Sequence, residues 1–158
     1  MDQKLFEQGE TITDFIQSLG DKREKFEQHM AETTPPGDLP GDLKLAVIAE
    51  DWSGDVLYNV PVLFRMAQEA GWDLRVFRRD QYPELMDQYL KDGLYRSIPV
   101  AIIYDQDFNE LANWIERPEI ATRIIDEESL KLRRRLREEN KAAWREAAIQ
   151  EVTKLVNS

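Results

Sequence analysis

Hydrophobic positions in the middle of the chain follow strand patterns and a helix pattern in turn. The unbroken apolar run from Leu45 to Ala49 is typical of a strand that is covered on both faces. Residues 55–70 carry apolar side chains at helical spacing, and Gly71 after them favours the end of a helix. Residues 73–78 alternate polar and apolar positions and predict a second strand. The central region therefore begins as strand, helix, strand.

Three further elements follow at short intervals. Residues 83–91 predict a short helix with Pro83 in its first turn. Residues 99–104 form a third apolar strand, and residues 110–115 predict a fourth. The turn between these last two strands is tight enough to make them antiparallel. The order β-α-β-α-β-β predicts a fold of the α/β class.

Helical patterns flank this core on both sides. The N-terminal segment has apolar side chains at helical spacing, with Thr13 as a helix cap, and a linker rich in proline and glycine follows at residues 33–41. The C-terminal pattern predicts one long helix or two, with Glu138–Asn140 as the weakest point. We expect one domain over residues 1–158, with N-terminal helices over 1–33, a core over 43–116 and C-terminal helix over 118–157.

Net charge narrows the classes of partner. The chain has 31 acidic and 21 basic residues, which gives a formal charge of −10. This balance opposes binding to nucleic acid and to anionic membrane surfaces, because both need a positive face. The first ten residues lack the basic start and apolar stretch of a secretory signal, and no run is long enough to cross a bilayer. A cytoplasmic protein is expected.

The absence of cysteine restricts the chemistry further. Without cysteine the chain has no disulfide, no thiolate nucleophile and no thiolate metal ligand. His29 is the only histidine, so a typical zinc site is not expected, and we expect this residue on a helix surface. No cofactor and no metal site are predicted. The basic cluster Arg133, Arg134, Arg135 and Arg137 is flanked by Glu127, Glu128, Glu138 and Glu139, which predicts a solvated, ion-paired helix face.

One motif lies where the first strand meets its helix. The sequence Trp52-Ser53-Gly54-Asp55-Val56 resembles the Trp-Cys-Gly-Pro-Cys element of the thioredoxin family. It is more similar to the variant Trp-Cys-Gly-Asp-Cys of a bacterial branch of thioredoxin-like proteins. Pro61 matches the proline of the same helix in that family. The segment Ser97-Ile98-Pro99-Val100 resembles the family's loop with a cis-proline.

This resemblance covers residues 43–116. It implies a thioredoxin-like fold with helices on both faces of the sheet, and a groove in which the two motifs face each other. The family's chemistry needs a thiolate and a second thiol three residues later. Ser53 and Val56 occupy these degenerate redox positions, and Val47 stands where the family has a buried aspartate. The resemblance therefore implies a scaffold that has lost its redox chemistry.

Several motif residues allow two interpretations. Ser53 either caps the helix or orients a bound thiol such as glutathione, and Asp55 either acts as a base or stabilises the first helical turn; for both we favour the structural role. Trp52 either anchors a partner beside the groove or packs in the core. A cis bond before Pro99 would leave the backbone of Ile98 free to pair with an extended peptide.

The leading hypothesis is a redox-inactive module that binds an extended peptide or partner protein and is not an enzyme. Its candidate groove consists of Trp52, Ser53, Gly54, Asp55, Ile98 and Pro99. The alternatives are an enzyme that uses serine to bind glutathione or another small thiol, and a variant of a thiol–disulfide oxidoreductase whose cysteines were replaced. A third hypothesis is a homodimer formed through the terminal helices.

Overall fold

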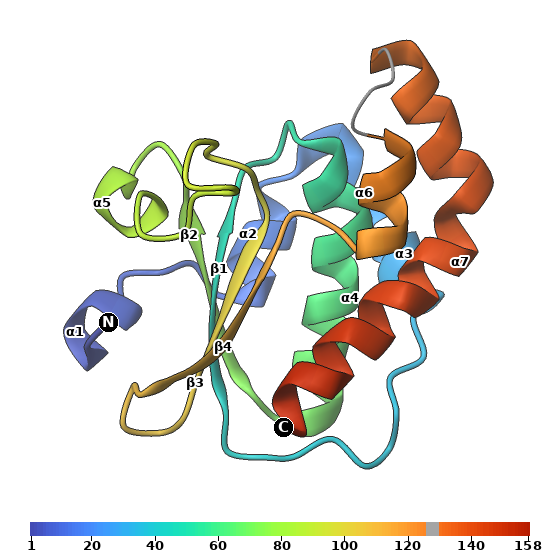
Figure 1. The fold of residues 1–158 in the computed structure, drawn as a ribbon. Helices are drawn as coiled ribbons and strands as arrows, with labels where there is room; N and C mark the ends of the chain where they lie inside the picture. The colour runs from blue at the N-terminus through green and yellow to red at the C-terminus, as the bar shows by residue number, and fades with distance from the viewer. Residues whose placement is uncertain (126–129) are drawn as a thin grey trace.

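The computed structural model describes residues 1–125 and 130–158. Four strands form one sheet in the order β2-β1-β3-β4, as Figure 1 shows. β1 (Lys44–Ala49) and β2 (Asp73–Arg78) are parallel and are joined by α4 (Gly54–Ala70). β3 (Val100–Tyr104) runs antiparallel to β1 and to β4 (Glu110–Ile115). The α/β class and the order β-α-β-α-β-β are confirmed.

Helices lie on both faces of the sheet (Figure 1). α4 covers one face, with helices from both ends of the chain packed on it, and the two shortest helices lie at the other face. The remaining helical elements are α1 (Gln3–Phe6), α2 (Ile12–Gln17), a 3₁₀ turn (Gly20–Lys22), α3 (Arg23–Ala31), α5 (Pro83–Met86), α6 (Glu119–Ile125) and α7 (Leu130–Val156).

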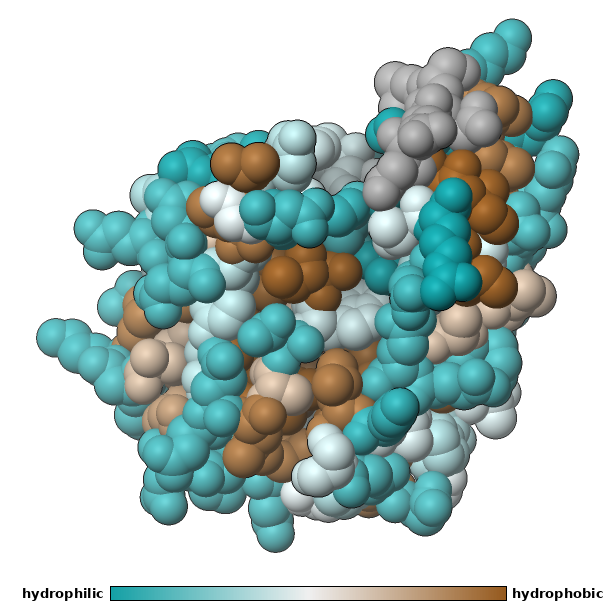
Figure 2. Space-filling view, viewed as in Figure 1, coloured by the Kyte–Doolittle hydropathy of each residue, from teal (hydrophilic) through white to brown (hydrophobic). Residues whose placement is uncertain are grey.

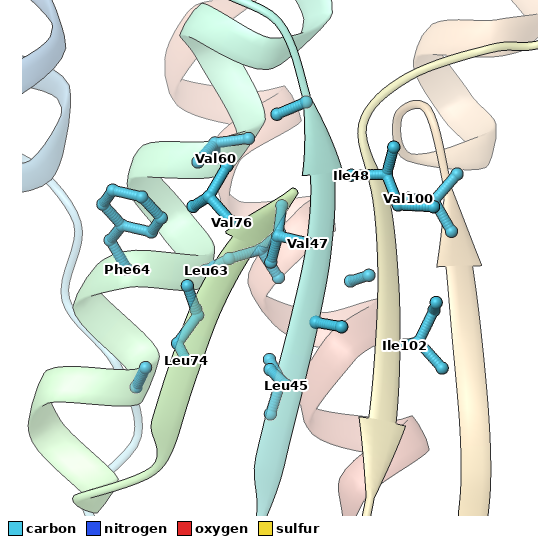
Figure 3. Packing of buried hydrophobic residues seen from close by; sticks show 14 of the residues in the cluster. Leu45, Val47, Ile48, Val60, Leu63, Phe64, Leu74, Val76, Val100 and Ile102 are labelled. Atoms are coloured by element: carbon cyan, nitrogen blue, oxygen red, sulfur yellow. The ribbon is translucent and has the colours of Figure 1, made fainter. Parts of the chain in front are cut away.

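The core forms where α4 meets the sheet. Every residue of β1 from Leu45 to Ala49 is fully buried, as the unbroken apolar run predicts. Leu63 and Phe64 of α4 lie over Leu74 of β2 (Figure 3). Because this packing holds α4 rigidly against two parallel strands, the start of the helix has a fixed position at the end of β1.

Both ends of α4 are marked by specific capping residues. Its first residue follows Ser53, whose hydroxyl accepts a hydrogen bond from the Val56 N–H. Its last residue precedes Gly71, which adopts the left-handed conformation with φ of 74° that glycine accommodates without strain. The predicted helix over 55–70 is therefore confirmed, with its start one residue earlier.

Two local predictions differ from the structure. The helix expected over 83–91 ends at Met86, and after it the backbone bonds join residues three apart: the Gln88 N–H donates to Leu85 and the Tyr89 N–H to Met86. The N-terminal cap of α2 is Thr11, not Thr13, and its hydroxyl accepts the Asp14 N–H at 3.2 Å.

The C-terminal region contains two helices in contact with each other. α6 packs against α7, and α7 continues without a break through Glu138–Asn140. The weak point expected there is wrong, because this stretch packs along α4 with Tyr58 bonded to Glu138. The negative charges expected at Glu127 and Glu128 lie outside the described residues.

Polar side chains dominate the face of the molecule shown in Figure 2, where they surround smaller apolar areas. This agrees with a chain in which 33% of residues are charged. None of the helices in the described part of the chain has the length and apolar character needed to cross a membrane.

Candidate functional site

The two motifs lie at the same end of the sheet. β1 ends at Ala49, three residues before Trp52, and its neighbour Ile48 pairs with Val100 of β3. Because these strands are antiparallel, Pro99, the residue before Val100, lies opposite the end of β1. The peptide bond between Ile98 and Pro99 is cis.

Arg79 connects the two motifs directly. Its guanidinium carbon lies 4.8 Å from the centre of the Trp52 ring, within the range of a cation–π contact. Its Nη1 donates a hydrogen bond of 3.3 Å to the backbone oxygen of Arg96, two residues before Ile98. Trp52 therefore lies beside the loop that leads into the cis peptide bond. The indole is 56% exposed, so it does not pack in the core.

The degenerate redox positions have structural roles. The Ser53 hydroxyl oxygen accepts the Val56 N–H at 3.4 Å, which is the contact of a helix cap. Val56 is fully buried in the first turn of α4, and Val47 is fully buried in β1. These three positions supply a cap and two core side chains, and none of them carries a thiol.

Asp55 differs from the expectation that it lines the groove. Its side chain is buried, with only 7% of the residue exposed, and it faces the C-terminal helices. Arg117 donates to it at 2.8 Å, and Arg137 approaches it at 3.4 Å. These ion pairs link the start of α4 to α7 and to the segment just before α6.

The second motif offers backbone groups rather than side chains to the surface. The side chains of Ile98 and Pro99 are buried. The Pro99 oxygen accepts the Glu116 N–H at 2.6 Å. By contrast, no hydrogen bond from the described residues reaches the N–H or C=O of Ile98. This peptide unit is the one that an extended segment could pair with.

The basic cluster of α7 is not a uniformly solvated face. Arg135 does pair with Glu139 at 3.5 Å and is largely exposed. Arg137, however, is buried over the start of α4, where a Cβ on Gly54 would lie only 2.7 Å from its Nη1. A signal for this existed in the sequence: Arg137 lies seven residues before Trp144, on the same helical face, and both are buried.

Part of this cluster lines a surface pocket next to the first motif. The pocket has a volume of about 400 Å³ and lies between α3, α4 and α7. Its lining contains four cations, one carboxylate and an apolar wall: Lys22, Lys25, Arg134, Arg137, Glu138, Trp52, Gly54, Leu57 and Tyr58. We call it the basic pocket. Its lining includes Trp52 and Gly54, two residues of the candidate groove.

His29 is buried rather than on the surface, with 2% of the residue exposed. Its Nδ1 lies 2.9 Å from Arg145 Nη2, and its ring lies 4.7 Å from the ring of Tyr58. Burial, reinforced by the Arg145 guanidinium, lowers the pKa of His29 from 6.5 to about 4. The side chain therefore stays neutral at physiological pH. In the part of the chain that is described, no three acidic or histidine side chains are grouped closely enough to hold a metal ion.

The fold and the paired motifs define a thioredoxin-fold protein without redox cysteines. The family described as thioredoxin matches residues 20–137, which is most of the chain, and the chain belongs to this family. A protein of unknown function from Pseudomonas aeruginosa has a similar structure, with a TM-score of 0.76 and 20% identity over 99% of this chain and 98% of that one. An HIV epitope-scaffold gives 0.74 and 19% with the same coverage. No curated protein matches the sequence.

The environment of Ser53 can be tested by placing sulfur in it. We expect the thiol of a Ser53→Cys variant to have a pKa well below the ordinary value of about 8.5, within the range of roughly 3.5–7.5 found at helix N-termini beside cations. The causes are the positive end of α4 and the guanidinium of Arg137 over Gly54. The pH dependence of alkylation by iodoacetamide measures this pKa. A Ser158→Cys variant, exposed at the other end of the fold, is the reference, and equal pKa values in the two variants would contradict the expectation.

Proposed function

We propose that this chain is a redox-inactive thioredoxin-fold module that binds an extended peptide segment of a partner protein. The segment would lie in the groove between Trp52–Gly54 and the loop Ile98–Pro99. Thiol–disulfide exchange requires two thiols, and the sequence contains no cysteine. What the chain retains is the part of the scaffold that holds a peptide.

The observation that carries this proposal is the exposed indole of Trp52. Removing a large apolar side chain from water lowers the free energy, yet 56% of Trp52 remains exposed. Arg79 packs over its ring. A rigid aromatic side chain with a large free area is a typical anchor for a partner. The unpaired backbone of Ile98 lies in the loop beside it and supplies a donor and an acceptor for strand pairing.

A comparison of two exposed apolar residues tests this proposal. Trp52→Ala should lower the amount of partner recovered from a cell extract by about tenfold or more, because an anchor residue contributes at least about 2 kcal/mol to binding. Leu111→Ala is the matched control, since Leu111 is 55% exposed but lies on β4, at the edge of the sheet. Quantitative mass spectrometry of the captured proteins provides the measurement.

A stability measurement serves as the control for this comparison. Thermal unfolding of both variants should match the parent chain, because both side chains are largely exposed. If Trp52→Ala and Leu111→Ala recover the same proteins in the same amounts, the groove is not the binding site.

A further inference from the structure

The basic pocket is unusual because the rest of the molecule is acidic. The chain carries a formal charge of −10, yet four of the nine residues that line this pocket are cationic and only one is acidic. The cations come from α7 and from the segment that begins α3, which are more than a hundred residues apart in the sequence. Their convergence is therefore a property of the fold.

The carboxylates around the pocket are already shared between several donors. Glu138 accepts hydrogen bonds from the Tyr58 hydroxyl at 2.6 Å, from Lys25 at 3.1 Å and from Lys141 at 3.0 Å. These donors lower the pKa of Glu138 to about 2, so it is ionised and fully engaged. Asp55 is likewise shared between Arg117 and Arg137.

Two cations of the pocket have no carboxylate partner within the described residues. The Lys22 ammonium donates to the backbone oxygen of Asp51 at 2.9 Å, which satisfies one donor but neutralises no charge. Arg134 is exposed and forms no ion pair with any described residue. The pocket thus keeps an excess of positive charge, to which the start of α4 at Gly54 adds the positive end of its dipole.

We propose that the peptide segment held by the groove is acidic, and that a glutamate or aspartate side chain of this segment occupies the basic pocket. This inference rests on the proposed function and names the chemistry of its partner. Trp52 lines both the groove and the pocket, so a segment lying on the indole reaches the free charges of Lys22 and Arg134. A carboxylate there forms charge-assisted hydrogen bonds that a neutral or basic side chain cannot. Elsewhere the acidic surface repels such a segment, so the pocket also selects its position.

Two pools of short peptides, fixed as Glu or as Gln at alternate positions and otherwise random, test this inference. Each pool is passed over the immobilised full chain, and the retained peptides are quantified by mass spectrometry. We expect the Glu pool to be retained about tenfold better. The preference should shrink as salt is added, because the free charges are close to the surface.

Two double variants test whether the cations of the basic pocket cause the preference for the Glu pool. The double variant Lys22→Gln/Arg134→Gln should lose the preference for the Glu pool. The double variant Lys131→Gln/Arg135→Gln changes the net charge equally on exposed residues outside the pocket, and it should keep the preference.

The outcomes separate this inference from the proposed function. Equal retention of the two pools, still reduced by Trp52→Ala, would leave the groove intact and overturn the acidic partner. An equal loss of preference in the two double variants would overturn the pocket as its cause. Retention of neither pool would overturn both the groove as a peptide site and the inference that depends on it.

Discussion

Replacing Asp55 with alanine should lower the free energy of unfolding by about 3 kcal/mol, which is typical of removing one partner from a buried ion pair. The carboxylate is buried between Arg117 and Arg137, at 2.8 Å and 3.4 Å. Arg117 keeps its contact with Glu116, whereas Arg137 loses its carboxylate while remaining buried. Chemical denaturation followed by circular dichroism measures the change, provided that the m-value stays constant.

Asp14→Ala is the matched control for this variant. Asp14 is also an acidic residue in the first turn of a helix, but it is exposed and has no arginine partner among the described residues. Its replacement should cost only about 0.5 kcal/mol, through the helix dipole alone. Equal effects of the two substitutions would mean that the buried ion pairs do not fasten the C-terminal helices. Hydrogen exchange should also show faster opening of α6 in the Asp55→Ala variant alone.

Acidification should destabilise the chain through His29, by about 2 kcal/mol between about pH 7 and about pH 5. The pKa of His29 is about 4 in the folded chain and 6.5 when unfolded. Between these values the unfolded chain binds a proton that the folded chain does not, so protonation favours unfolding. The contribution of His29 to the free energy of unfolding is therefore fully present above pH 6.5, and it is lost as the pH falls from 6.5 towards 4.

The groups around His29 explain the direction and define the control. Arg145, Lys25 and Lys141 oppose a positive charge on the imidazole, and Glu32 alone favours it. A His29→Gln variant should have nearly constant stability above about pH 5, where carboxylates are still ionised in both states. Denaturation curves at several pH values measure the difference between the two chains. Parallel loss of stability in both would show that another group is responsible.

The core could be predicted from sequence because its signals are local. The strand over 73–78 has the predicted bounds, and β1 contains the predicted buried run Leu45–Ala49, since burial on two faces leaves a continuous apolar pattern. α4 was also predictable, because Ser53 and Gly71 mark its two ends with their own side chain or backbone. Each of these signals lies within a few residues of the element that it defines.

The partners of charged residues could not be predicted in the same way. Asp55 bonds to Arg117 and Arg137, which are 62 and 82 residues away, and His29 meets Arg145 at a separation of 116 residues. No periodicity of a single helix shows which distant side chain will cover it. For this reason the sequence alone places Asp55 in the groove and His29 on the surface. α5 is also shorter than its helical spacing predicts, and turns with bonds between residues three apart follow Met86.

The close approach of Arg137 to Gly54 connects the packing of α7 on α4 with the shape of the basic pocket. A methyl group at this position would occupy the space of the Arg137 guanidinium, 2.7 Å from its Nη1, and would act as a wedge between two helices. The guanidinium would have to shift, and it is the group that pairs with Asp55 and forms part of the wall beside Trp52. One added carbon would thus change a buried ion pair and the wall of the basic pocket together.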